Sequence, residues 1–288
     1  MSRTPLSRRA FAAHTLGFAG ATVLAGACRP LLGAREGDPV GDDDPDHDSA
    51  ATLTPDGWAV GGTAAIGGDY PDPFAEDVAT ACALTCAMTR GPCYAATLER
   101  KDISEGYPGL PVRLALRVVD ATCRPVAGAV VDIWHTSAAG FYSGDDAIAL
   151  CTRGDADAAS HRFFRGTQTT DASGRVDFDT VLPGWYGGRT VHIHFGVRRG
   201  EDEYVVSQLV FDDALVAAVT TRHPDYAARG APDTWNTTDA IVRDAVQEAL
   251  LTTALQPDGA LLASKTLVIR SSLEEELCVY GDGDEMPP

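Results

Sequence analysis

The chain has 288 residues, of which 44% are hydrophobic and 22% charged, so it is long enough to bury the core of one large domain or two small ones. Its formal net charge of −18 argues against nucleic acid as a partner, because binding phosphates requires a surplus of Lys and Arg. The same charge favours a soluble, self-repelling protein.

Residues 1–28 are typical of a cleaved export signal. The Ser-Arg-Arg-Ala-Phe sequence at residues 7–11 resembles a twin-arginine motif, and an apolar stretch runs from Thr15 to Ala27. That stretch is short and rich in Ala and Gly, which suits a signal peptide better than a membrane-spanning helix. The sequence therefore predicts export by the twin-arginine route and an extracytoplasmic location, secreted or lipid-anchored.

Cys28 directly follows the Ala-Gly-Ala sequence at residues 25–27, which has the small-x-small pattern of a cleavage site. Cys28 could therefore become a lipid-modified N-terminus, although lipoprotein signals prefer Leu where Ala25 stands. A lipid anchor and simple secretion both stay open.

Six cysteines follow Cys28, and an even number in an exported protein suggests disulfides. The sequence alone does not select one pairing among the many possible ones. A zinc site is disfavoured, because the first three of these cysteines lack a second Cys-x-x-Cys pair. The six are Cys82, Cys86, Cys93, Cys123, Cys151 and Cys278.

Residues 29–78 are predicted to be an acidic flexible linker. The Gly-Asp-Asp-Asp-Pro-Asp-His-Asp sequence at residues 41–48 is a run of like charge that cannot bury itself. It lacks the glycine and terminal glutamate of an EF-hand, which disfavours a calcium loop. The folded domain is then expected over residues 79–288.

From Cys82 onward the pattern predicts a mainly β domain. Residues 112–118 alternate with the period of two that is typical of a strand, and Asp-Ala-Ser-Gly at residues 171–174 is a turn signal. The expected strands are residues 112–118, 129–134, 175–178, 190–195, 204–211 and 266–269, and the expected helices are 212–220 and 238–251. Short strands at this spacing indicate an antiparallel β-sandwich with a few short helices and long loops.

His192 and His194 are the sharpest local signal for chemistry. Residues two apart on a strand point to the same face, so the two imidazoles would converge on one point. Histidine is a frequent ligand of iron, zinc and copper. The alternative is a pair of hydrogen-bonded surface histidines on a half-exposed strand.

Two tyrosines stand where they could join this pair. Tyr186 follows Pro-Gly-Trp at residues 183–185, a turn-forming setting that can fold the phenol back beside the strand. Tyr142 follows Ala-Gly-Phe at residues 139–141. Either tyrosine alone would be interpreted as a core or interface residue. The ordered combination with the two histidines favours a metal site.

Residues 91–211 resemble the intradiol ring-cleavage dioxygenases, the family of protocatechuate and catechol dioxygenases. Each matching fragment is weak, but the ordered set is specific. The fragments are Gly-Pro-Cys-Tyr at 91–94, Gly-Ala-x-x-Asp-Ile-Trp at 128–134, Gly-x-Tyr-Ser at 140–143, Phe-Arg-Gly at 164–166, Thr-Asp-x-x-Gly at 170–174, Pro-Gly-x-Tyr at 183–186 and His-Ile-His-Phe at 192–195.

In that family two tyrosinates and two histidines hold iron(III). The resemblance places these ligands at Tyr142, Tyr186, His192 and His194, and it places an active-site arginine at Arg189 and a pocket glutamine at Gln208. Phenolate is a hard, strongly donating anion that stabilises iron(III) over iron(II), and the ferric ion is a Lewis acid toward a chelated catechol.

The resemblance also implies the reaction. Tyr186 would leave the metal and take up a proton as substrate binds, and Arg189 would stabilise anionic charge on the substrate. Dioxygen would then open the catechol ring between its two hydroxylated carbons and give a muconate-type diacid.

Three departures from the family pattern leave questions open. The loop at residues 187–191 is shorter than in the classical enzymes, so the identity of the catechol stays open. Cys93 replaces the usual aromatic residue, which is consistent with a disulfide there. The N-terminal helical dimerisation region of catechol dioxygenases has no counterpart, and the oligomeric state stays open.

The competing hypothesis is a non-catalytic exported β-sandwich that binds a ligand without turnover. Its histidine pair would be structural or would bind zinc or copper. Colour separates the two hypotheses, because ferric tyrosinate makes a protein wine-red whereas an empty or zinc-loaded sandwich is colourless.

Overall fold

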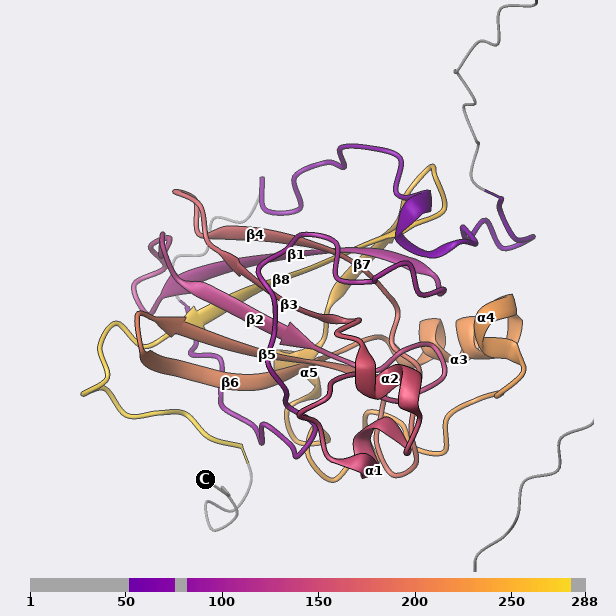
Figure 1. Ribbon diagram of the computed structural model, residues 1–288. Helices are drawn as coiled ribbons and strands as arrows, with labels where there is room; N and C mark the ends of the chain where they lie inside the picture. The colour runs from indigo at the N-terminus through magenta and orange to yellow at the C-terminus, as the bar shows by residue number, and fades with distance from the viewer. Residues whose placement is uncertain (1–51, 76–81, 281–288) are drawn as a thin grey trace, which may run out of the picture. The chain divides into compact units, whose positions relative to one another are not determined.

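Eight strands form two stacked four-stranded sheets in the computed structural model, which describes residues 52–75 and 82–280 (Figure 1). The predicted export signal and the acidic run at residues 41–48 lie outside the described residues. The strands are β1 (Pro111–Asp120), β2 (Val130–Trp134), β3 (Arg165–Thr169), β4 (Arg175–Val181), β5 (His192–Arg199), β6 (Asp202–Val210), β7 (Thr252–Leu255) and β8 (Leu261–Ile269).

One sheet has the order β4-β1-β8-β7 and the other the order β3-β2-β5-β6. Neighbouring strands are antiparallel except β1 and β8, which are parallel. The predicted antiparallel β-sandwich is therefore confirmed, with this one parallel pair as an exception. A parallel pair needs a long crossover, and the whole second sheet lies between β1 and β8 in the chain.

The period of two assigns each strand one face toward the core and one away from it. Leu114 and Leu116 of β1 pack in the same buried cluster as Ile193 and Phe195 of β5. Because alternate residues point to opposite faces, His192 and His194 lie on the other face of β5, outside the space between the sheets. The candidate chemistry is thus on the outer face of the second sheet.

The helices are short, and Figure 1 shows most of them gathered toward one end of the sandwich. They are η1 (Gly62–Ala65, a 3-10 helix), α1 (Ala149–Thr152), α2 (Ala156–Ser160), α3 (Asp213–Arg222), α4 (Pro224–Ala227) and α5 (Val246–Ala249). Within residues 52–75 and 82–280, no helix is long and apolar enough to span a bilayer.

The first of the two predicted helices is correct and the second is largely wrong. Helix α3 covers residues 213–220 of the predicted 212–220, and the Asp212 carboxylate caps it by accepting hydrogen bonds from the backbone N–H groups of Ala214 and Leu215. Residues 238–251 form turns and only the one-turn helix α5. There the Asp239 side chain binds the backbone N–H groups of Ile241 and Val242, which competes with a helical start.

The predicted linker extends too far toward the C-terminus. Within residues 52–75, Trp58 and Ala59 are buried, and the Ala59 backbone N–H donates to the Gly259 carbonyl over 2.8 Å. The Arg222 guanidinium lies 5.3 Å from the Trp58 ring centroid. This segment packs on the sandwich because its apolar residues find partners there, so the domain begins well before residue 79.

The six cysteines after Cys28 form three disulfides, which confirms the prediction of disulfides and resolves their pairing. The bonds are Cys82–Cys123, Cys86–Cys278 and Cys93–Cys151. The third bond joins the segment before β1 to α1, and both of its ends contact the region described next.

Candidate metal centre

Strand register brings a row of side chains together on the outer face of the second sheet. His194 of β5 lies opposite Trp134 of β2 on one side and Gln208 of β6 on the other. Directly paired residues in an antiparallel ladder point to the same face. Gln208, predicted from spacing alone, therefore lies beside His194 and is buried with it.

The loop after β2 carries Tyr142 to the same place. Gly140 has a φ of +76°, and a Cβ there would lie 2.0 Å from the Trp185 carbonyl oxygen, so only glycine fits this close approach. Two residues later the backbone N–H of Tyr142 donates to the Cys151 carbonyl over 2.9 Å. The Tyr142 side chain is buried.

Tyr186 arrives from the other side on a tight turn. The Arg189 backbone N–H donates to the Tyr186 carbonyl over 3.3 Å, and Gly187 and Gly188 form the exposed tip between them. The φ of Gly188 is +81°. This turn puts the half-buried Tyr186 phenol and the Arg189 side chain next to β5, as the turn signal predicted.

Four donor atoms converge within this cluster. His192 Nε2 lies 3.4 Å from Tyr142 Oη, 3.3 Å from Tyr186 Oη and 3.1 Å from His194 Nε2. A neutral imidazole nitrogen either donates one hydrogen or accepts one, so it cannot satisfy three such neighbours. A shared metal ion accounts for the arrangement better than hydrogen bonding does.

The two histidine rings are oriented by different means. His192 Nδ1 donates to the Thr190 carbonyl over 2.7 Å, which leaves Nε2 free to act as a ligand. His194 is stacked on Trp134, with ring centroids 5.0 Å apart and planes 5° apart. Gly91 lies against its far edge, where an added Cβ would be 3.4 Å from His194 Cε1.

Burial sets the protonation of Tyr142, His192 and His194, which together with Tyr186 make up the quartet. It lowers the pKa of His192 to about 3 and that of His194 well below its usual value, so both imidazoles are neutral at pH 7. It also raises the pKa of Tyr142 well above the usual value, and the neighbouring Tyr186 adds to this effect. Without a bound cation Tyr142 is a neutral phenol, so metal binding must release its proton.

The residues present fit a ferric ion. Ligands about 2 Å from one metal lie roughly 3–3.5 Å apart, and the separations around His192 Nε2 fall in this range. The donors are hard phenol oxygens and imidazole nitrogens, a set that suits iron(III). In the part of the chain that the structure describes, no group of three or more His, Cys, Asp or Glu forms a rival metal site.

Arg189 and Gln208 lie together beside the quartet. The Arg189 Nη2 donates to Gln208 Oε1, and Gln208 Nε2 donates to the Thr89 carbonyl over 3.0 Å. The Arg189 Nε donates to Asp239 Oδ2 over 2.8 Å. The structure thus brings all six predicted site residues into one cluster.

Comparisons with known proteins agree with the fragments and the fold. Residues 89–229 match the family model described as Dioxygenase. The catechol 1,2-dioxygenase 1 of Acinetobacter lwoffii is 28% identical over 158 residues, 44% of this chain and 48% of that protein. The intradiol ring-cleavage dioxygenase of Tetranychus urticae superposes with a TM-score of 0.58 and 27% identity, over 66% of this chain and 95% of that one. Together these comparisons support the intradiol ring-cleavage dioxygenase family for this chain.

The chlorocatechol 1,2-dioxygenase of Pseudomonas sp. strain P51 is a further relative of this chain, 27% identical over 139 residues, 42% of this chain and 50% of that protein. The chain spans about half the length of these curated relatives. The stretch that matches the family model contains all the fragments from 91–94 to 192–195.

Three residues of the candidate site were not predicted from the sequence. Trp134 and Arg165 both lie in the matching fragments, but nothing in the sequence indicated their contacts. Trp134 stacks on His194. The buried Arg165 guanidinium lies 5.8 Å from the Tyr142 ring centroid. Arg165 donates to the Ser143 and Cys93 carbonyls, which ties the loop of Tyr142 to the segment that covers His194. Asp239 lay in a stretch predicted to be helical and carried no signal.

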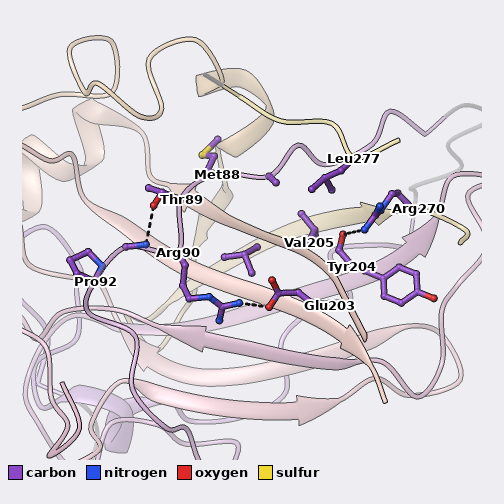
Figure 2. Close-up of a pocket in the computed structure, with 12 residues that line it drawn as sticks. Met88, Thr89, Arg90, Pro92, Glu203, Tyr204, Val205, Arg270 and Leu277 are labelled. Carbon is purple, nitrogen blue, oxygen red and sulfur yellow. Dashed lines mark hydrogen bonds and ion pairs between the residues drawn. The ribbon is translucent and has the colours of Figure 1, made fainter. Parts of the chain in front are cut away.

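A cavity of about 630 Å³ lies along β6 but is not the metal centre. Figure 2 shows Met88, Arg90 and Leu277 around it, with Arg90 paired to Glu203 on the strand. No quartet residue lines it. The cavity and the quartet share a wall, because segment 89–92 lines the cavity and also contacts His194 and Gln208.

Proposed function

We propose that this intradiol dioxygenase binds iron(III) through Tyr142, Tyr186, His192 and His194, and opens a catechol-type ring with dioxygen. Cleavage falls between the two hydroxylated carbons and gives a muconate-type diacid. The convergence of two phenols and two neutral imidazoles on one point carries this proposal. The curated relatives, named as catechol and chlorocatechol 1,2-dioxygenases, support the substrate class.

The two tyrosines have different environments and so take different roles. Tyr142 is buried and its backbone is bonded to Cys151, which keeps it in place as a permanent ligand. Tyr186 is half-buried on a turn with two glycines, so its phenol can move with little loss of packing. Tyr186 would be a phenolate when the site is loaded, so its Oη would take up one of the two catechol protons as substrate binds, and the other would pass to solvent.

The other side chains orient the substrate and neutralise its charge. When bound, iron(III) supplies the Lewis acidity that favours the catechol dianion. The Arg189 guanidinium stabilises the negative charge on the ring oxygens, and Gln208 holds that guanidinium toward His194. Burial strengthens this electrostatic effect, since the site excludes most of the water.

The test is reconstitution of the purified protein with ferric iron, followed by assay against a panel of catechols. We expect a wine-red protein that consumes dioxygen and catechol in equal amounts. The zinc-loaded protein is the matched control and should be colourless and inactive. A ferric protein that stays colourless, or that binds catechols without turnover, would support the binding-module alternative instead.

We also propose that the protein is exported by the twin-arginine route and acts outside the cytoplasm, secreted or lipid-anchored at Cys28. Three disulfides support this location, because disulfides persist in oxidising compartments. Replacing both Arg8 and Arg9 by Lys should retain the protein in the cytoplasm, as measured by cell fractionation. Unchanged export of that variant would contradict the route.

A further inference from the structure

Asp239 is a fully buried carboxylate beside the candidate metal centre. It lies beyond residues 89–229, the part of the chain that matches the family model. Its Oδ2 accepts from the Arg189 Nε and from the Thr190 backbone N–H, each over 2.8 Å. Its Oδ1 accepts from the Ile241 backbone N–H over 2.8 Å. The carboxylate is thus held by its own segment and points at the Arg189 turn.

The Arg189 guanidinium is fixed at two of its three nitrogens. Nε is bound to Asp239 and Nη2 to Gln208, and Gln208 is bound in turn to the Thr89 carbonyl. A planar guanidinium that is held at two edges cannot rotate about its own axis. Gln208 faces the same side of the sheet as His194, so the plane is fixed with one edge toward the quartet.

The contact with Asp239 is an ion pair in a buried setting. Burial alone would raise the pKa of the Asp239 carboxyl, but the Arg189 guanidinium and the backbone N–H groups of Thr190 and Ile241 hold that pKa below its usual value. The carboxylate is therefore ionised at neutral pH, and loss of its charge would leave Arg189 with neutral partners in place of an ion pair.

We propose that Asp239 is a positioning residue, which acts through Arg189 to hold the guanidinium where charge develops on the substrate. The inference rests on the proposed function, because Asp239 would orient the Arg189 guanidinium, which the proposed ring opening requires. It adds to the site a residue from the segment after α4.

The test is Asp239→Asn, which keeps the shape and one acceptor oxygen but removes the charge. We expect kcat for catechol to fall about 10–100-fold, since displacing a catalytic group by about 1 Å costs on the order of 100-fold. The dissociation constant of catechol can be measured without dioxygen from the change in the charge-transfer band. It should change by less than about threefold. Iron content should stay at the wild-type level.

Two comparisons separate positioning from a general structural role. Asp239→Asn should lower kcat little further in an Arg189→Ala background, because the guanidinium that Asp239 orients is then absent. Asp233→Asn is the matched control: Asp233 lies on the same segment and accepts from the Gly188 N–H of the same turn, over 3.1 Å, without contacting Arg189. Its kcat should stay near that of the wild type.

Several outcomes overturn the inference while the proposed function stands. They are a wild-type kcat in the Asp239→Asn variant, an equal loss in the Arg189→Ala background, or an equal loss in Asp233→Asn. If Asp239→Asn does not fold, Arg189→Lys takes its place, because it keeps the charge but cannot contact Asp239 and Gln208 together. That variant should lose most activity, and a wild-type kcat would contradict the inference. A wild-type protein that cleaves no catechol would instead contradict the proposed function.

Discussion

Replacing Tyr142 by Phe, or His192 by Ala, should remove the charge-transfer colour and most of the bound iron. Each change deletes one of the four donor atoms that converge at His192 Nε2. Loss of a partner that merely orients a ligand costs about 10–100-fold in metal affinity, so loss of a ligand should cost more than about 100-fold. Iron content by atomic absorption and the visible spectrum measure both effects.

Tyr107→Phe is the matched control for this experiment. Tyr107 also has a hydrogen-bonded hydroxyl, which donates to Asp157 of α2 and does not contact the quartet. The control should keep its colour, iron and activity. If Tyr142→Phe and His192→Ala also kept full iron and activity, the four residues would not be the metal ligands.

Removing the Cys93–Cys151 disulfide by two Cys→Ser changes should destabilise the fold and weaken the metal centre together. The bond closes a separation of 58 residues, and the chain-entropy model gives about 4 kcal/mol for a loop of this size. Cys151 also accepts the backbone hydrogen bond of Tyr142, and Cys93 accepts from the buried Arg165. Denaturant unfolding and iron titration measure the two losses.

The Cys82–Cys123 disulfide provides a control of nearly equal closure entropy. It closes 41 residues, so its removal should cost about as much in the free energy of unfolding. Neither the Cys82 nor the Cys123 backbone is bonded to a quartet residue in the described part of the chain. Iron affinity should therefore fall only in the Cys93/Cys151 variant. An equal fall in both would show that global stability alone determines metal binding.

All four central strands were predicted at least in part, whereas two of the four edge strands were missed. β1 and β5 alternate in sequence, because the face turned toward the core carries their large apolar side chains. β3 and β7 were not predicted as strands, and both are edge strands with polar sequences. An edge strand needs fewer apolar residues, so its periodicity is weak.

The candidate site was predictable where its chemistry is local in sequence. His192 and His194 share a face because of the two-residue period, and Tyr186 shares a turn with Arg189. Asp239 could not be found in this way, because it contacts Arg189 across a sequence separation of 50. Such a contact depends on how the segment after α4 folds back, and no local pattern encodes that.

Cleavage of a catechol between its two hydroxylated carbons is tested most directly by the product formed under labelled dioxygen. The ferric protein should be incubated with catechol and ¹⁸O₂, and the product analysed by mass spectrometry. We expect a muconate-type diacid that contains both oxygen atoms of one dioxygen molecule. A semialdehyde, formed by cleavage beside the hydroxyl groups, would contradict the proposed function.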